Sequence, residues 1–244
     1  MQASPFNILR LGLILLIVLA LAAHPFLPPK REVLHPHIGN VAALYSDDAW
    51  GGKTTATWMD RAASHWRCNL VQSGVFAVCG IAIEFSSIRD LSDYESLSVR
   101  LSYTGDAKKL RIYMRNHNPL YSSLQDVDSL KFNAITLHSA DFAKTETIIH
   151  LSEFAVADWW LEERDIPREL SRPELSGVAT LGIDFPPPPA FGQHDIKIER
   201  IELIGTWISP EKLYLGIIVL GILFLVGEAA IRFTLLRRNI NKRL

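Results

Sequence analysis

The sequence of 244 residues carries 25 basic and 26 acidic side chains, which gives a formal net charge of −1. This balance lacks the concentration of basic residues that nucleic-acid binding requires, so we expect no nucleic-acid partner. The apolar residues gather in two runs near the ends of the chain. The residues between the runs have the mixed composition of a single folded domain.

The first apolar run is Leu11–Ala23, which follows Arg10. A helix that crosses a bilayer needs about 20 mostly apolar residues, and the stretch from Ile8 to Phe26 reaches that length. The run also fits a signal peptide, because Ala20-Leu21-Ala22 resembles a cleavage site. We therefore expect residues 1–29 to be an N-terminal transmembrane helix or signal anchor, with a cleaved leader as the alternative. Both alternatives export the residues that follow.

The second apolar run, Leu213–Ile231, predicts a transmembrane helix over residues 211–236. Glu228 lies one helical turn before Arg232, so we expect the two side chains to pair near the membrane surface. The basic residues of the tail, 237–244, mark the cytoplasmic side of a membrane.

These features predict a protein of the bacterial inner membrane with both termini in the cytoplasm and a periplasmic domain over residues 30–210. An exported domain is a place where disulfides persist. The two cysteines, Cys68 and Cys79, flank the turn signal Gln72-Ser73-Gly74, and the runs beside the turn alternate like strands. We expect a hairpin with a cross-strand disulfide, and two buried thiols are the alternative.

Alternation of apolar and polar residues recurs along the middle of the chain, as in half-buried strands. The clearest strand candidates are Leu97–Tyr103, Leu110–Met114, Phe132–Leu137, Thr147–Leu151, Ala179–Phe185 and Ile196–Leu203. The apolar residues of the last candidate change parity near Glu199-Arg200, which predicts a β-bulge there. The stretch Trp159–Glu169 is the best helical or irregular insertion. The pattern predicts an all-β, antiparallel sandwich flanked by two transmembrane helices.

Two short strings resemble the galactose-binding-type jelly rolls of carbohydrate-binding modules. One is Asp90-Leu91-Ser92-Asp93-Tyr94-Glu95-Ser96-Leu97, which is followed by two alternating strands and Arg115-Asn116; the other is Asp47-Asp48-Ala49-Trp50-Gly51-Gly52-Lys53-Thr54. This resemblance implies a jelly-roll fold. It also implies a structural calcium ion, for which Asp47 and Asp48 are the candidate ligands because calcium prefers carboxylate oxygens. The two residues fit a simple turn equally well.

A second resemblance rests on four strings in the later part of the chain: Leu151-Ser152-Glu153-Phe154, Asp158-Trp159-Trp160, Glu169-Leu170-Ser171-Arg172-Pro173-Glu174 and Gly192-Gln193-His194-Asp195-Ile196. Their order, with the apolar run behind them, resembles the extracytoplasmic sensor region of bacterial membrane-bound diguanylate cyclases. The Gly-Gly-Asp/Glu-Glu-Phe signature of the cyclase domain does not occur, so we expect no cyclase activity from this chain. The resemblance implies an isolated sensor or a fragment of a longer protein.

Binding is better supported by the residues than catalysis, because no nucleophile elbow, phosphate-binding loop or zinc-protease motif occurs. Sugars stack on aromatic rings and bond to amides and guanidinium groups. The candidate ligand-binding residues are Arg115, Asn116, Asn118, Tyr121, Trp159 and Trp160. The two tryptophans fit a structural role in the core as well.

The function expected from these features is a membrane-anchored sensory or ligand-binding domain that recognises a carbohydrate-like or other small ligand. It would signal through the second membrane helix to a cytoplasmic partner or within a homodimer. An envelope scaffold that binds another protein is one alternative. A membrane-anchored carbohydrate-active enzyme is the other.

Overall fold

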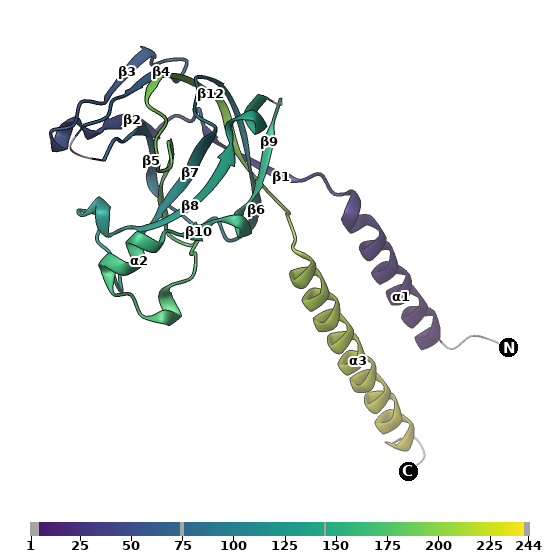
Figure 1. The fold of residues 1–244 in the computed structure, drawn as a ribbon. Coiled ribbons are helices and arrows are strands. Elements are labelled where there is room, and N and C mark those ends of the chain that lie inside the picture. The colour runs from purple at the N-terminus through teal and green to yellow at the C-terminus, as the bar shows by residue number, and fades with distance from the viewer. Residues whose placement is uncertain (1–4, 74–75, 144, 242–244) are drawn as a thin grey trace. The chain divides into compact units, whose positions relative to one another are not determined.

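The computed structural model describes residues 5–73, 76–143 and 145–241. The chain divides into two compact units (Figure 1). One is Lys30–Gly205, which holds all the strands, and the other combines the residues before 30 with those after 205. The predicted middle domain ended at residue 210, five residues beyond the last strand.

Two antiparallel sheets form the strand-bearing unit. The first sheet has the order β3 (Thr55–Asp60), β4 (His65–Leu70), β12 (Gly192–Gly205), β6 (Tyr94–Thr104) and β9 (Thr147–His150), with β1 (Lys30–His35) also paired to β12. The second sheet has the order β10 (Ala155–Val156), β8 (Lys131–His138), β7 (Lys109–Asn116), β11 (Val178–Asp184), β5 (Cys79–Arg89) and β2 (Val41–Ser46). Most connections pass from one sheet to the other, as in a jelly roll.

Short helical segments connect several strands. The α-helix α2 spans Asp158–Arg164, and the 3₁₀ turns are His24–Phe26, Asp47–Trp50, Val127–Ser129, Ser139–Ala143, Leu151–Glu153 and Arg168–Leu170. The predicted helical stretch Trp159–Glu169 therefore contains one short helix and the beginning of a 3₁₀ turn.

The alternating residues make the core in the predicted way. Leu97, Val99 and Leu101 of β6 are buried in it, and so are Leu110 and Ile112 of β7. Each of the six predicted strands overlaps an observed one. The predicted bulge in β12 is confirmed, since the pairing with β6 shifts register between Ile198 and Arg200.

The predicted hairpin around the cysteines is wrong. β4 belongs to the first sheet and β5 to the second, so the two strands do not pair. The turn residue Gly74 and the following Val75 lie outside the described residues. Cys68 and Cys79 are nevertheless bonded, with an S–S distance of 1.97 Å. The disulfide joins the two sheets through the core, because alternation turns both side chains inward.

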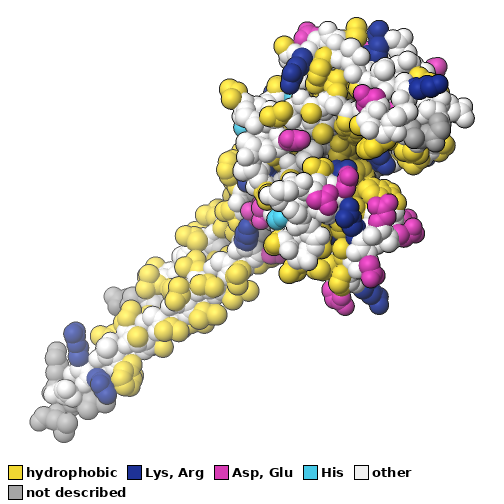
Figure 2. Space-filling view, turned by 90° about the vertical axis from the view of Figure 1, so that its left-hand side faces the viewer, with side chains coloured by type: hydrophobic (Ala, Val, Ile, Leu, Met, Phe, Trp, Pro, Cys, Tyr) yellow, Lys and Arg dark blue, Asp and Glu magenta, His cyan; other side chains and the backbone are white. Residues whose placement is uncertain are grey.

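The other unit contains the two long helices α1 (Pro5–Ala23) and α3 (Pro210–Asn241). Residues Phe6–Phe26 and Pro210–Arg238 are long and apolar enough to cross a membrane, and almost none of their surface is buried. Figure 2 shows hydrophobic side chains along this unit and basic side chains near its end. Helix α3 continues through residues 237–241 of the predicted basic tail, and residues 242–244 lie outside the described residues. The cytoplasmic position of this tail stays a prediction.

Both linkers to the helical unit leave the sandwich at one place. Lys30, the first residue of β1, pairs with Gly205, the last residue of β12. The sequence analysis did not place β1, which resembles no alternating run. Its pairing with β12 brings together the two points at which the chain enters and leaves the sandwich.

Candidate functional site

The outer face of the second sheet carries three rows of side chains. Paired strands align residues directly opposite one another, and these residues share a face. The face opposite the core carries the rows Tyr45–Gly80–Asp184–Arg111, Ala43–Ala82–Gly182–Tyr113 and Val41–Glu84–Thr180–Arg115–Phe132. The rows combine small residues with aromatic and charged ones.

A groove of about 690 Å³ lies over these rows. Its size falls in the range of sites that hold small ligands. The lining residues are Ala43, Leu44, Tyr45, Trp50, Phe76, Val78, Ala82, Glu84, Arg111, Tyr113, Arg115, Val127, Asp128, Phe132, Trp159, Asp184 and Pro187. In Figure 2 hydrophobic side chains gather in the hollow between the upper and lower parts of the rounded body.

Two glycines keep the groove open. A Cβ atom at Gly182 would lie 2.2 Å from Cζ of Tyr113, so the tyrosine ring occupies the space above that glycine. A Cβ atom at Gly80 would lie 2.6 Å from the hydroxyl of Tyr45. Larger residues at these positions would push both tyrosines off the sheet.

A buried ion pair forms the polar part of the floor. Arg111 donates from Nε and Nη2 to the two oxygens of Asp184, at 2.7 and 2.6 Å, and the hydroxyl of Tyr45 donates to Asp184 at 3.0 Å. Burial raises the pKa of Asp184 although Arg111 opposes this effect. Burial, together with the charge of Asp184, also raises the pKa values of Tyr45 and Tyr113, so both hydroxyls stay protonated.

Stacked aromatic rings form the rest of the floor. The rings of Tyr113 and Phe132 are 4.8 Å apart and nearly parallel. The guanidinium groups of Arg111 and Arg115 lie 5.1 and 5.3 Å from the centre of the Phe132 ring. Arg115 also donates to the carbonyl oxygen of Val127 at 2.7 Å. The groups of the floor therefore contact one another and are mostly buried.

The edges of the groove carry exposed aromatic side chains. Trp159 of α2 is 42% exposed and lies beside β8 and β10, at one edge of the second sheet. Trp50 follows β2 at the opposite edge and is 65% exposed, and Phe76 is 55% exposed. These three rings are aromatic surfaces that a ligand in the groove can reach.

Asp47, predicted as a metal ligand, connects the two segments that carry Trp50 and Phe76. Its Oδ1 accepts the amide of Thr54 at 2.9 Å, and its Oδ2 accepts the amide of Val78 at 3.3 Å. Asp48 accepts the hydroxyl of Ser46 and the amide of Ala49. Within the described ranges no group of three or more His, Cys, Asp or Glu side chains is placed to hold a metal. Calcium binding by these aspartates stays a prediction.

The six predicted ligand-binding residues do not form one site. Arg115 and Trp159 line the groove. Trp160 is completely buried, and its Nε1 donates to the carbonyl oxygen of Asp128 at 3.3 Å. Asn116 is also buried, where its side chain accepts the amide of Gly177. Contact of these residues with a ligand stays a prediction, but Asn116 and Trp160 have no surface to offer it.

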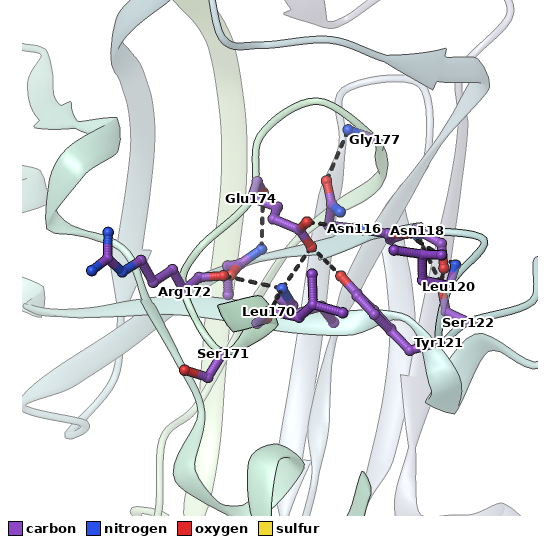
Figure 3. Close-up of polar contacts among 12 residues, drawn as sticks. Asn116, Asn118, Leu120, Tyr121, Ser122, Leu170, Ser171, Arg172, Glu174 and Gly177 are labelled. Carbon is purple, nitrogen blue, oxygen red and sulfur yellow. Dashed lines mark hydrogen bonds and ion pairs between the residues drawn. The ribbon is translucent and has the colours of Figure 1, made fainter. Parts of the chain in front are cut away.

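Asn118 and Tyr121 belong to a second polar group, which we name the Glu174 cluster: Glu174, Lys131, Tyr121 and Asn118. Figure 3 shows Asn118 and Tyr121 beside the carboxylate of Glu174. Asn118 donates to Glu174 at 2.9 Å, and the Tyr121 hydroxyl donates to the other carboxylate oxygen. The fully buried Lys131 donates to Glu174 at 2.6 Å and to the carbonyl oxygens of Leu170 and Arg172. The cluster holds the segment around residues 170–177 against β7 and β8.

The sequence analysis missed most of the groove. Arg111, Tyr113 and Arg115 alternate with the core residues of β7, so the pattern that predicts the strand also places them on its outer face. The available signal for a binding surface was therefore the run of aromatic and charged residues on the outer face of this strand. Glu84 and Asp184 carry no such signal, since the sequence alone does not place β5 beside β11.

Comparisons with known proteins find similar folds at low identity. No protein-family model and no curated protein matches the chain. A family 11 carbohydrate-binding module of the cellulosomal cellulase Lic26A-Cel5E of Clostridium thermocellum is 13% identical with a TM-score of 0.49, and the match covers 74% of this chain and 96% of that one. The Clostridium thermocellum module in complex with a β-1,3-1,4-mixed-linked tetrasaccharide is 12% identical with a TM-score of 0.46, covering 73% and 96%.

A low-affinity xylan-binding module from Roseburia intestinalis is 8% identical with a TM-score of 0.32, covering 67% of this chain and 94% of that one. The neighbours are thus jelly-roll modules, and no comparison shows the expected association with diguanylate cyclases.

Proposed function

We propose that this chain is a membrane-anchored binding protein whose groove takes a carbohydrate chain. The observation that carries the proposal is the open groove of about 690 Å³ with exposed aromatic side chains at both edges of the sheet. The C–H faces of sugar rings stack on such side chains, while sugar hydroxyls need polar partners nearby. Trp159 and Trp50 supply the stacking surfaces.

Available polar groups complete the arrangement. Glu84 is exposed in the groove and makes no hydrogen bond or ion pair with any described residue. Asp128 is 79% exposed and lies 3.6 Å from Arg115. Carboxylates accept hydrogen bonds from sugar hydroxyls, and a guanidinium group such as that of Arg115 donates to sugar hydroxyls. Glu84 and the exposed carboxylate of Asp128 can accept hydrogen bonds from a ligand, unlike Asp184, whose oxygens already accept from Arg111 and Tyr45.

We propose that the groove binds a carbohydrate without hydrolysing it. A glycosidase places two carboxyl groups about 5 to 9.5 Å apart around the scissile bond. Glu84 and Asp184 lie two rows apart on the sheet, which corresponds to roughly 13 Å along the strands. The distance and the ion pair of Asp184 argue against Glu84 and Asp184 as a catalytic pair.

Anchoring and signalling form the second part of the proposal. We infer that α1 and α3 hold the sandwich at the bacterial inner membrane, on its periplasmic side. β11 carries Asp184 of the groove floor and continues through Pro186–Pro189 directly into β12, which leads to α3. A polyproline segment is stiff, so a ligand that shifts β11 would move the chain that enters the second helix.

The test is binding of polysaccharides by the full chain in lipid nanodiscs. Neutral and acidic glycans are screened on an array, and the affinity for those retained is measured by calorimetry. We expect Trp159→Ala to weaken binding at least tenfold, which corresponds to about 1.4 kcal/mol. Trp207→Ala is the control, since Trp207 is 65% exposed and lies outside the sandwich unit.

Two results would contradict the proposal. One is retention of no glycan by the wild-type chain. The other is equal loss of binding in the Trp159 and Trp207 variants. A protein that copurifies in fixed proportion and is lost in Trp159→Ala would instead favour the envelope scaffold, with the groove as its contact surface.

A further inference from the structure

Half-buried residues recur at every third or fourth position along both terminal helices. On α1 they are Leu13, Ile17 and Ala20, and on α3 they are Leu213, Ile217, Gly221 and Phe224. Every residue between them is exposed. This spacing places the half-buried residues on one face of each helix, and we name these two stripes the seam. The sequence does not reveal the seam, because both helices are apolar all round.

Near Arg10, the acidic residue Glu228 connects the two helices. Glu228 is only 6% exposed, and both of its oxygens bond to Arg10 of α1, at 2.9 and 2.7 Å. Arg232, the partner expected from the sequence, also contacts Glu228 at 2.6 Å. The guanidinium group of Arg232 lies 4.7 Å from the centre of the Phe6 ring. Arg10 thus contacts the other helix.

A second polar contact joins the opposite ends of the same helices. The ring atom Nε2 of His24, just after α1, lies 2.8 Å from the carbonyl oxygen of Ile208, just before α3. The two contacts therefore bracket the apolar seam.

Ionisable side chains in a membrane segment are costly and nearly always have a partner inside the protein. Removal of α1 as a leader would leave Glu228 with a partner on its own helix only and would uncover the whole seam of α3. We propose that α1 is never removed, and that it is the permanent intrachain partner of α3, fixed by the ion triad of Arg10, Glu228 and Arg232. This inference does not depend on what the groove binds.

The first experiment measures the intact mass of the full chain, purified from membranes by a carboxyl-terminal tag. We expect the mass of the complete sequence, with α1 present. A product that begins near Ala23 would overturn the proposal, whatever the behaviour of any variant.

The second experiment tests the seam with pairs of cysteines. The two native cysteines are bonded to each other, so introduced thiols are the only free ones. The pair Leu13→Cys with Phe224→Cys joins two half-buried positions close to the Arg10–Glu228 contact. The control pair is Leu13→Cys with Leu223→Cys, because Leu223 is 64% exposed. In native membranes, a short bis-maleimide should link the first pair at least fivefold more than the control, within one chain.

The third experiment removes the triad charge. Glu228→Gln and Arg10→Gln should each lower the yield of the Leu13–Phe224 crosslink at least twofold, and the double variant should lower it no further. Arg237→Gln serves as the control, because Arg237 stacks on Phe233 of its own helix. Equal crosslinking of both cysteine pairs, or crosslinks that form only between two chains, would overturn the intrachain pairing.

Discussion

The groove and the Glu174 cluster are built from the same kinds of residues on neighbouring strands, yet they differ in what they leave free. In the Glu174 cluster, the amino group of Lys131 makes three bonds, all to this chain. In the groove, Glu84 makes none with any described residue, and Trp159 is 42% exposed. Closed polar clusters hold a fold together, whereas open ones are available to a ligand. Polar and aromatic composition alone does not separate the two.

Trp159 and Trp160 offer the sharpest test of this difference, because they are adjacent residues on α2. Trp160→Ala should lower the free energy of unfolding by about 3 to 5 kcal/mol, since it empties a buried site that packs against Tyr121. Trp159→Ala should lower it by about 1 kcal/mol or less while weakening ligand binding. Urea unfolding followed by tryptophan fluorescence measures both. Similar losses for the two variants would mean that the exposed face of Trp159 is structural.

The ion pair of the Glu174 cluster should show the next largest effect. Glu174→Ala leaves Lys131 buried with only two carbonyl partners, so we expect a loss of about 2 to 3 kcal/mol in urea unfolding. The double variant Lys131→Met with Glu174→Leu should recover part of this loss, because no charge is then left buried. Neither variant should change the affinity of the groove. A loss of ligand affinity in a variant that stays folded would show that the groove and the Glu174 cluster form one site.

The residues just named show why sequence analysis found the fold more readily than the site. Alternation identified six strands and the bulge in β12, because it depends only on neighbouring residues. It did not decide which strands pair. The hairpin around Cys68 and Cys79 was predicted wrongly for this reason: two inward-facing cysteines fit a hairpin and a link between sheets equally well.

The same limit explains the candidate ligand residues. Helix α2 turns by about 100° per residue, so of two adjacent tryptophans one faces inward and the other outward, and the sequence does not say which. Asn118 and Tyr121 have the right chemistry for sugar binding, but Glu174, more than fifty residues away, occupies them. Such a partner becomes visible only when the chain is folded.

The pH dependence of stability should separate the Glu174 cluster from the rest of the sandwich. Burial alone would raise the pKa of Glu174, but hydrogen bonds from Lys131, Tyr121 and Asn118 lower it below the usual value. A carboxyl with a lowered pKa stabilises the fold above its unfolded pKa of about 4.3, and this stability is lost as the pH falls through the folded pKa.

Stability should therefore fall below about pH 4.5, and Glu174→Gln should make this fall less steep. The fall will not vanish, because the pKa values of Glu32, Glu146 and Asp195 are lowered as well, through hydrogen bonds from Tyr94, Ser98 and Arg67. Thermal unfolding between pH 3 and 7 gives the slope, with Glu163→Gln on the surface of α2 as the control. An unchanged slope in Glu174→Gln would show that Lys131 does not hold the carboxylate in its charged form.

At the edge of the groove, Asp47 is also bonded within the chain. We expect the smallest change in stability there, on addition of calcium. Its two oxygens already accept the amides of Thr54 and Val78, so this carboxylate resembles the closed Glu174 cluster more than the open groove. Millimolar CaCl₂ followed by a chelator should shift the melting temperature by less than about 1 °C. A calcium-dependent rise of about 4 °C or more, absent in Asp48→Asn, would establish a metal site formed by the two aspartates. In that case the ion, and not the amide bonds of Asp47, would position Trp50 and Phe76 for the ligand.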